Sequence, residues 1–558
     1  MKFTLIGFIV VLLLSWFLIK PLVGPGYFPM HDDTQVARVV VMGRALREGQ
    51  FPVRWVSDLG YGYGYPLYNF YAPLPYYFGG TLHAFGVDSI VATKTMFAAG
   101  ILLAVVFFYF FADYIFGTIS AIVGTLLFSY APYHAVQVYI RGAVGEYWAI
   151  AFAPLILWGF SLIVKKKTSI GIVVGGIGFA CVIVSHTILG FLTSGLVIGG
   201  ILLYSLYAFI RKSFDAQLMM HLFMSVLLGF GLSAFFWLPA FVEMGSTSVS
   251  SMISRAPTNF FDHFVCPLQL WDSPWGYAGS APGCVDGMSF KLGKLQLIVT
   301  MIAALMWVVS LKNKKKSTIT AMATIGVILF VLSVVGMIDV SKSLWLIVPF
   351  VSFIQYPWRL LAFVMLAMGI SASFFISTIQ QRTHQILLAI VVVGICLFMN
   401  AKLFAPQYLY AQDSKAFETT DELRFRISKI SDEYLPPGIK KPISASEIIT
   451  APIIGNENLR VTEITDSDTN YKAILESNID QQTVFQKAVF PGWIYKINGL
   501  LVRPTIVQGE PRMVLSKGKS TFEASLTNTP IRIVGNVLSV ISFVLVGGVL
   551  TYGKKTKT

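Results

Sequence analysis

Long apolar runs recur along the whole length of this chain. Among its 558 residues, 55% are hydrophobic and 13% are charged, whereas soluble domains carry about 25% charged residues. A run of about 20 apolar residues can cross a bilayer as a helix, which satisfies its own backbone hydrogen bonds in lipid. We therefore expect a mainly α, polytopic membrane protein with about twelve transmembrane helices in a lipid bilayer. The runs that approach or exceed this length lie near residues 3–19, 97–110, 188–210, 218–241, 295–311, 321–337, 361–379 and 531–552.

The distribution of basic residues predicts how the chain is oriented. A net charge of +14 would favour a nucleic-acid partner in a soluble protein, but here the basic residues fall in short loops between apolar runs. With about twelve crossings they lie on one side, which is cytoplasmic by the positive-inside rule. Both termini are thus expected on the cytoplasmic side of the plasma membrane, and no nucleic-acid partner is expected. The residues concerned are Lys2, Lys165, Lys166, Lys167, Arg211, Lys212, Lys312, Lys314, Lys315, Lys316, Arg382, Lys554, Lys555 and Lys557.

Polar segments divide the chain into domains. Residues 1–400 are expected to form the transmembrane domain, interrupted by outer loops at 21–89 and 243–293 that are too polar to continue in lipid. Residues 401–530 are expected to form an extracytoplasmic β-rich domain. Residues 531–558 are expected to form a C-terminal transmembrane helix and a basic cytoplasmic tail.

Two local patterns support this division. The first apolar run lacks the small-residue cleavage site of a signal peptide and is followed directly by Lys20-Pro21, so we expect a retained anchor helix. In the third polar region, residues 459–464 and 483–489 alternate in the manner of strands. Asn498-Gly499 between two apolar segments is a strong hairpin signal. A sandwich-like module follows from these segments.

The four cysteines fall into two groups. Cys181 and Cys396 lie within apolar helices, where a thiol packs as a small core residue. Cys266 and Cys284 lie in one outer loop, where an oxidising environment allows a disulfide. A disulfide and two free thiols remain equal alternatives at this point.

His31-Asp32-Asp33 places two adjacent carboxylates directly after the first helix, at the outer membrane surface. Ionisable groups at that depth are often functional, and a carboxylate there can act as a base. The alternative is that Asp32 or Asp33 caps a helix over residues 33–48, which we expect to lie along the membrane surface.

Charged and imidazole groups stand at further outer helix ends. Arg141 suits a phosphate, and the alternative is an ion pair with Glu146, although two glycines between them mean that they need not pair. His186 serves a ligand or bonds a neighbour. Arg359 follows Tyr356-Pro357-Trp358 and is expected to point into a polar cavity, the alternative being extension to the interface.

A tyrosine- and glycine-rich run, residues 60–77, includes Tyr61 and Tyr63. It forms an interfacial aromatic belt or a surface for a sugar ring or prenyl chain. No phosphate-binding loop, dinucleotide fingerprint, zinc-spaced Cys/His set or serine-hydrolase elbow occurs, which disfavours ATP-driven and nicotinamide chemistry.

The order of these features resembles the GT-C superfamily of integral-membrane glycosyltransferases. More locally, the chain looks like bacterial YfhO-type and related uncharacterised membrane proteins. Some of these carry a label relating them to 6-pyruvoyl-tetrahydropterin synthase, but the zinc-binding histidine cluster of that enzyme has no counterpart here. The residues that carry the resemblance are His31-Asp32-Asp33, Gly60-Tyr61-Gly62-Tyr63-Gly64 with Phe70-Tyr71-Ala72-Pro73-Leu74, Tyr356-Pro357-Trp358-Arg359, Glu433-Tyr434-Leu435-Pro436 and Phe490-Pro491-Gly492-Trp493.

The resemblance implies inverting transfer of a sugar from a polyprenyl-phosphate-linked donor to an extracytoplasmic glycan, lipid or protein. By that resemblance Asp32 or Asp33 is the base, and Arg141 and Arg359 bind the phosphate. The remaining candidates for substrate binding are His31, Glu146, His186, Tyr61, Tyr63, Tyr356 and Trp358.

A divalent cation is used by some members of the superfamily and not by others, and two aspartates alone do not decide this. We therefore assign no metal ligand. A lipid or sugar-lipid flippase, and a noncatalytic assembly protein, are the rival functions.

Overall fold

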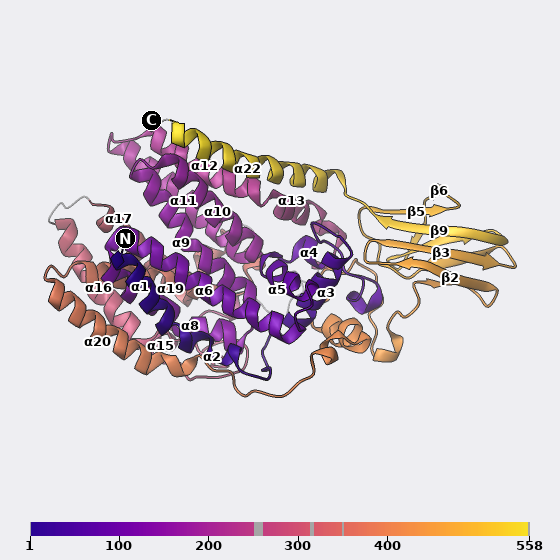
Figure 1. Ribbon diagram of the computed structural model, residues 1–558, viewed down its shortest axis with the longest axis horizontal. Coiled ribbons are helices and arrows are strands. Elements are labelled where there is room, and N and C mark those ends of the chain that lie inside the picture. The colour runs from indigo at the N-terminus through magenta and orange to yellow at the C-terminus, as the bar shows by residue number, and fades with distance from the viewer. Residues whose placement is uncertain (1, 250–259, 313–316, 349–350, 556–558) are drawn as a thin grey trace.

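The computed structural model describes residues 2–249, 260–312, 317–348 and 351–555. It shows a helix bundle with a β-sandwich projecting from one end (Figure 1). Both ends of the chain lie at the opposite end of the bundle. The helices are α1 (Lys2–Leu14), α2 (Trp16–Val23), α3 (Gln35–Arg47), α4 (Leu67–Phe70), α5 (Leu74–Ala84), α6 (Ser89–Phe116), α7 (Thr118–Ser129), α8 (Pro132–Ala135), α9 (Val144–Val164), α10 (Thr168–Ser185), α11 (Thr187–Ile210), α12 (Ala216–Leu232), α13 (Ala234–Glu243), α15 (Pro267–Trp271), α16 (Lys294–Lys312), α17 (Thr318–Met337), α18 (Lys342–Trp345), α19 (Leu361–Ser377), α20 (Arg382–Asn400), α21 (Ser428–Ile430) and α22 (Pro530–Lys555).

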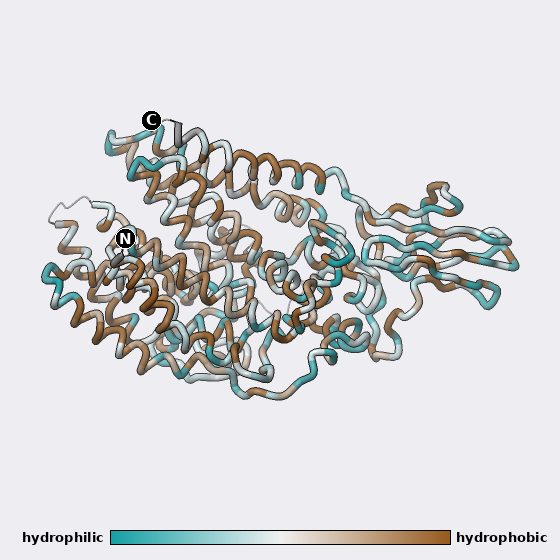
Figure 2. Tube along the Cα trace, viewed as in Figure 1, coloured by the Kyte–Doolittle hydropathy of each residue, from teal (hydrophilic) through white to brown (hydrophobic). Residues whose placement is uncertain are grey.

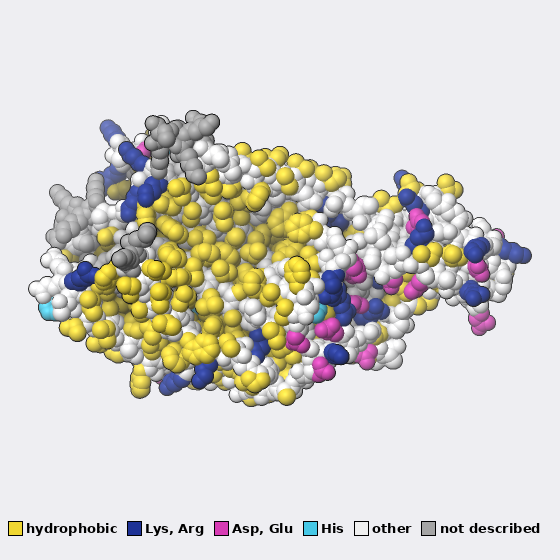
Figure 3. All heavy atoms as spheres, viewed as in Figure 1, with side chains coloured by type: hydrophobic (Ala, Val, Ile, Leu, Met, Phe, Trp, Pro, Cys, Tyr) yellow, Lys and Arg dark blue, Asp and Glu magenta, His cyan; other side chains and the backbone are white. Residues whose placement is uncertain are grey.

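The helices of the bundle are those of a multi-pass membrane protein. Among the described residues, nine helices are long and apolar enough to span a bilayer, and three bent pairs raise the number to twelve if each pair is one span. Hydrophobic residues dominate the tube through the bundle in Figure 2, and hydrophobic side chains cover most of its visible surface in Figure 3. The predicted mainly α architecture of about twelve spans with a C-terminal β-rich domain is confirmed.

Basic side chains gather at the end of the bundle that carries the chain termini (Figure 3). Lys165, Lys166 and Lys167 follow α9 there, and Arg211 follows α11. Residues 314–316 and Lys557, which belong to the predicted cytoplasmic set, lie outside the described residues. The orientation of the termini stays a prediction.

Glycines bring α9 and α10 into close contact. A Cβ atom added at Gly159 would lie 2.3 Å from the backbone nitrogen of Gly175, so a larger residue does not fit. Small residues commonly allow such close approach between membrane helices. The start of α9 and the end of α10 reach the site described below.

Helix α3 differs from its prediction. The expected surface helix is buried on nearly all sides and packs against α5 and α6. Arg38, on the polar face, is also buried, because its partners come from other parts of the sequence. It donates to the Tyr76 hydroxyl at 3.4 Å. The helix is capped by Thr34 without a side-chain hydrogen bond, so the capping role considered for Asp32 or Asp33 is wrong.

Two antiparallel sheets form the β-sandwich. The four-stranded sheet has the order β1-β4-β8-β7, and the five-stranded sheet has the order β2-β3-β9-β5-β6. They share one core, in which Tyr471, Phe485 and Phe522 come from both sheets. The strands are β1 (Ile453–Ile454), β2 (Leu459–Asp466), β3 (Asn470–Ser477), β4 (Gln481–Phe485), β5 (Trp493–Ile497), β6 (Leu500–Val502), β7 (Thr505–Val507), β8 (Glu510–Leu515) and β9 (Gly518–Leu526).

The predicted hairpin is present, and of the two alternatives for Cys266 and Cys284 the structure has the disulfide. Ile497 pairs with Leu500 across Asn498-Gly499, and both turn residues have positive φ, as a two-residue hairpin requires. Cys266 and Cys284 form a disulfide within the second outer region, of which residues 250–259 lie outside the described part.

Residues 401–452, which precede the first strand, form short helices and turns. Their apolar side chains, among them Phe417, Leu423 and Leu435, join the core of the helix bundle and not that of the sandwich. This connecting segment therefore belongs structurally to the membrane domain and supplies one wall of the site.

Candidate functional site

A cavity of about 910 Å³ opens at the helix ends that the sequence predicts to face outward. It lies where α9, α11 and the short helix Pro357–Leu360 begin. Helix α9 runs from the cavity to Lys165, and α10 returns to His186 beside the cavity. The cavity is thus at the end of the bundle opposite the basic loops.

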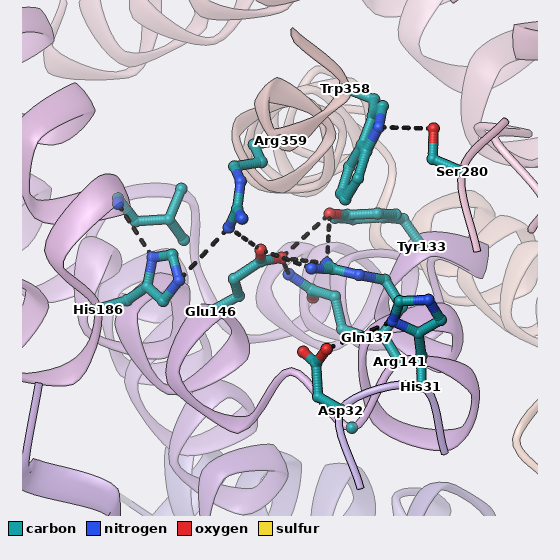
Figure 4. Close-up of polar contacts among 12 residues, drawn as sticks. His31, Asp32, Tyr133, Gln137, Arg141, Glu146, His186, Ser280, Trp358 and Arg359 are labelled. Carbon is teal, nitrogen blue, oxygen red and sulfur yellow. Dashed lines mark hydrogen bonds and ion pairs between the residues drawn. The ribbon is translucent and has the colours of Figure 1, made fainter. Parts of the chain in front are cut away.

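Buried charged residues line this cavity, and three of them, Arg141, Glu146 and Arg359, form what we call the cavity cluster (Figure 4). Arg141 donates to both Glu146 oxygens, at 2.5 and 2.9 Å. Arg359 donates to Glu146 Oε1 and, at 2.6 Å, to Gln355 Oε1. The ion pair considered from the sequence exists, and it includes a second arginine from a distant helix.

The local backbone fixes Arg141 beside the first outer loop. A π-turn, Val136–Ile140, and Gly142 at a φ of 64° bend the chain before α9. The His31 amide donates to the Ile140 carbonyl, and the Asp32 amide to the Arg141 carbonyl, each at 2.9 Å. This short backbone pairing sets Asp32 at the edge of the cavity cluster.

The two adjacent aspartates have different surroundings. Asp32 lines the cavity, its side chain is 44% exposed, and it lies 3.4 Å from His31 Nδ1. Burial opposes its ionisation, but the His31 hydrogen bond and the charge of Arg141 outweigh burial and hold the pKa of Asp32 below its usual value. Asp33 is not among the lining residues and pairs with Arg426 at 3.2 Å.

This separation bears on a metal site. The two carboxylates do not converge on one point, as the oxygen ligands of a divalent cation must. Within the described residues, no group of three or more His, Cys, Asp or Glu side chains is placed to hold a metal ion. The residues present therefore do not fit a metal at Asp32 and Asp33.

His186 contributes a hydrogen-bond donor to the cavity. Burial lowers its pKa to about 3, against the opposing charge of Glu146, so the ring is neutral. Its Nδ1 accepts the Leu189 amide at 3.1 Å, which leaves the single ring proton on Nε2. That atom lies 3.4 Å from Arg359 Nη1, another donor. An anionic oxygen beside this pair can accept from both donors.

Two aromatic side chains complete this wall. Tyr356 and Trp358 stack with ring centroids 4.7 Å apart, and the Arg141 guanidinium lies 4.6 Å from the Trp358 ring centroid. Trp358 Nε1 also donates to Ser280 Oγ at 3.0 Å, which ties the disulfide-bonded loop to the cavity. Of the four aromatic residues considered for the site, these two line the cavity.

Tyr61 and Tyr63 lie elsewhere. Neither is among the residues that line the cavity. The Tyr61 hydroxyl donates to Asp432 Oδ2 at 3.2 Å, and the Tyr63 carbonyl accepts the Ala488 amide at 2.8 Å. These residues hold the connecting segment and the sandwich against the bundle.

A second wall of the cavity includes Arg38, Tyr71, Ser431, Glu433 and Tyr434. Tyr71 lies in the tyrosine- and glycine-rich run for which a binding surface was considered, but the other four residues were not assigned from the sequence. For Glu433 and Tyr434 the available signal was the Glu433-Tyr434-Leu435-Pro436 motif, which carries the resemblance but suggests no chemistry on its own.

Comparison with models of known protein families gives no match to this sequence. An uncharacterised protein of Lactococcus lactis subsp. cremoris is 25% identical over 218 residues, which are 38% of this chain and 35% of that protein. The aligned part thus spans about a third of the relative.

Two solved membrane proteins have loosely similar structures. The oligosaccharyltransferase AglB of Archaeoglobus fulgidus, in complex with an inhibitory peptide and dolichol-phosphate, is 13% identical with a TM-score of 0.41; the match covers 80% of this chain and 61% of AglB. ArnT of Cupriavidus metallidurans, bound to undecaprenyl phosphate, is 12% identical with a TM-score of 0.30; the match covers 72% of this chain and 89% of ArnT.

Proposed function

We propose that this protein is a glycosyltransferase of the plasma membrane that moves a sugar from a polyprenyl-phosphate-linked donor to an extracytoplasmic acceptor with inversion. The observation that carries the proposal is the cavity that Asp32 shares with the buried Arg141 and Arg359. This reaction needs a carboxylate that takes the proton of the acceptor hydroxyl and positive charge that stabilises the leaving phosphate.

Asp32 is the proposed base. It takes the proton of an acceptor hydroxyl as the hydroxyl oxygen attacks the anomeric carbon of the donor sugar. The bond between that carbon and the phosphate oxygen breaks, and the polyprenyl phosphate leaves with the electron pair. The lowered pKa keeps Asp32 ionised and ready to accept the proton at neutral pH. Asp33 is occupied by Arg426.

The cavity cluster is the proposed phosphate site. Its two arginines carry one positive charge more than Glu146 neutralises. The negative charge that develops on the leaving phosphate is stabilised by Arg359 and by the Nε2 proton of His186. Dolichol-phosphate and undecaprenyl phosphate, bound in the two neighbouring structures, belong to the proposed class of donor lipid.

The test is transfer of radiolabelled sugar from a panel of polyprenyl-phosphate donors by purified protein in lipid nanodiscs, with and without EDTA. Asp32→Asn should lower the rate roughly 10²–10⁴-fold at equal folded yield. Asp33→Asn, the matched control, should stay within about threefold of wild type because Asp33 lies outside the cavity.

An equal loss in both variants contradicts the assignment of Asp32. If the wild-type protein transfers no sugar from any donor but moves lipid between vesicle leaflets, the enzyme proposal fails and the flippase takes its place. A requirement for a divalent cation would appear as loss of transfer in EDTA and its recovery on adding Mg²⁺ or Mn²⁺.

A further inference from the structure

The second wall of the cavity comes from the connecting segment and α3. Ser431, Glu433 and Tyr434 precede the sandwich, and Arg38 faces them from α3. The proposed transfer reaction uses none of these residues. They nevertheless line the same cavity as Asp32.

Glu433 has acceptor capacity to spare. The Ser431 hydroxyl lies 3.2 and 3.1 Å from its two oxygens but has one proton and can donate to only one of them at a time. Glu433 forms no ion pair with any residue that the structure describes. The backbone amide of Glu433 also donates to its own carboxylate. An ionised carboxylate has about four lone-pair sites, so about half of them remain open to a ligand.

Arg38 does not neutralise this carboxylate by direct contact. Its Nη2 donates to Ser431 Oγ at 3.2 Å, so the serine hydroxyl stands between the two charges. The guanidinium carbon lies 4.0 Å from the Tyr71 ring centroid, which keeps the arginine against the aromatic ring. Ser431 is thus held in place as a donor toward Glu433.

The two walls therefore attract different chemistry. The cavity cluster and His186 present donors and a net positive charge, whereas on the second wall the charges of Arg38 and Glu433 offset each other and the open carboxylate oxygens of Glu433 present acceptors. A phosphate is attracted by the net positive charge of the cavity cluster, and the Glu433 carboxylate has no proton to donate to it. A group rich in hydroxyls has the donors that Glu433 lacks, and its apolar faces can pack against Tyr71 and Tyr434.

Asp32 lies between these walls. Its amide is bonded to the Arg141 carbonyl on one side. Its own carbonyl accepts from Gln35 Nε2 at 3.2 Å, and Gln35 begins the helix that carries Arg38. The backbone of Asp32 is thus bonded to both elements, and its side chain lines the same cavity in which a hydroxyl on the second wall and a phosphate on the first would be bound.

We propose that Glu433, aligned by Ser431, holds the acceptor in this cavity and that the acceptor is a carbohydrate bound through its hydroxyl groups. The description of the bound sugar as the acceptor rests on the proposed transferase function. The carbohydrate site itself does not. Glu433 is a positioning residue, so it acts on acceptor affinity and not on proton transfer.

The experiment measures two ligands on the same full-length protein in lipid nanodiscs free of glycoside detergent. One probe is radiolabelled undecaprenyl phosphate. The other is a panel of diazirine-bearing octyl β-glycosides with glucose, galactose or mannose head groups, and cross-linked peptides are mapped by mass spectrometry. We expect wild-type labelling in residues 430–436 and at Tyr71.

Glu433→Gln should reduce this labelling roughly tenfold or more, because hydrogen bonds to a charged group are lost, and Ser431→Ala should reduce it severalfold. Undecaprenyl phosphate binding should stay within about twofold of wild type in both, since the phosphate site is on the other wall. Glu457→Gln, the same substitution at an exposed residue of the outer region, should change neither ligand. In a transfer assay, Glu433→Gln should raise the acceptor KM and leave kcat nearly unchanged.

Two results would overturn the inference while leaving the transferase proposal intact. One is labelling of Glu433→Gln equal to wild type. The other is undecaprenyl phosphate binding by a wild-type protein that no glycoside labels on the second wall. A third result would separate the two proposals in the other direction. If glycoside labelling depends on Glu433 but the protein does not bind undecaprenyl phosphate, the carbohydrate site is supported and the proposed donor is contradicted.

Discussion

Two buried clusters of this molecule have the same charges but different surroundings. In the cavity cluster, Arg141 and Arg359 share Glu146. In a second group, which we call the closed cluster, Arg54 and Arg532 lie near Glu243, and Arg532 pairs with it at 2.9 Å. Each has two arginines and one glutamate, all at most 8% exposed.

The closed cluster is satisfied by fixed protein groups. Arg54 donates to the amide oxygens of Asn69 and Asn536, each at 3.0 Å. Glu243 accepts from Asn69 Nδ2 at 2.9 Å and from the Thr529 hydroxyl at 2.6 Å. Burial first, and then the charge of Arg532, lower the pKa of Arg54 to about 10. These contacts fasten α13 and α22 to the first outer loop.

Access is what distinguishes the clusters. Each leaves one arginine Nε, that of Arg54 or of Arg359, without a hydrogen-bond partner among the described residues, so unsatisfied donors do not separate them. The cavity cluster borders about 910 Å³ of space and faces the donor proton of His186, whereas no residue of the closed cluster lines that cavity. Charge composition alone therefore does not identify a ligand site.

Replacing the glutamate of each cluster should give the largest difference between them, and the difference is in the stability of the fold. Glu243→Gln leaves two arginines in a closed interior, and breaking a buried pair in this way costs about 3–5 kcal/mol. Glu146→Gln should cost less, because water in the cavity can solvate Arg141 and Arg359. The check is the thermal unfolding midpoint of each variant in the same detergent. Equal destabilisation would refute the distinction between closed and accessible clusters.

The disulfide offers a second contrast, because the loop that it closes is bonded to a residue of the cavity. It closes a loop with a sequence separation of 18 residues, for which loop entropy predicts a contribution of about 3 kcal/mol. Ser280, inside that loop, bonds Trp358 in the cavity. In the double variant Cys266→Ser, Cys284→Ser, amide hydrogen exchange should speed up in residues 260–293 and stay unchanged in 234–243 and 530–536. Equal acceleration in all three segments would contradict a local role.

The sequence predicted those features that depend on neighbouring residues. Apolar length alone predicts the spanning helices, and Asn498-Gly499 predicts a hairpin because few residues adopt positive φ at both positions. Helix α3 shows the limit. Its apolar pattern is typical of a surface helix, but Arg38 is buried because Ser431, 393 residues away, provides its partner.

The same limit applies to the sites. Asp32, Arg141, Glu146, His186, Tyr356, Trp358 and Arg359 could be nominated because each stands at a predicted outer helix end, and they do share one cavity. Glu433 lies in a segment with no helical pattern to place it. Glu243 and Arg532 meet across 289 residues, which no local spacing reveals. Asp32 and Asp33 could not be ranked until their partners were known.

Removing one arginine from each cluster should affect binding in one case only. Arg359→Met should weaken binding of radiolabelled undecaprenyl phosphate by about 1.5–3 kcal/mol, roughly 10- to 150-fold, since it removes charge-assisted hydrogen bonds. Arg54→Met should lower stability but leave binding per folded molecule unchanged. Equal weakening by both variants would show that the lipid responds to overall charge and not to the cavity.

The smallest expected effect is on the pH dependence of activity. Protonation of Glu433 and protonation of Asp32 should each lower activity as the pH falls, at two different pH values. Burial raises the pKa of Glu433 above the ordinary glutamate value, whereas that of Asp32 is held below the ordinary aspartate value. As pH falls, Glu433 is therefore protonated first and loses acceptor capacity, while Asp32 is still ionised. The kcat/KM for a carbohydrate acceptor should thus decline at a higher pH than kcat measured at saturating acceptor. Glu433→Gln should abolish the decline at higher pH and leave the decline at lower pH. If kcat/KM and kcat decline at the same pH in the wild-type protein, the separate roles of Glu433 and Asp32 are contradicted.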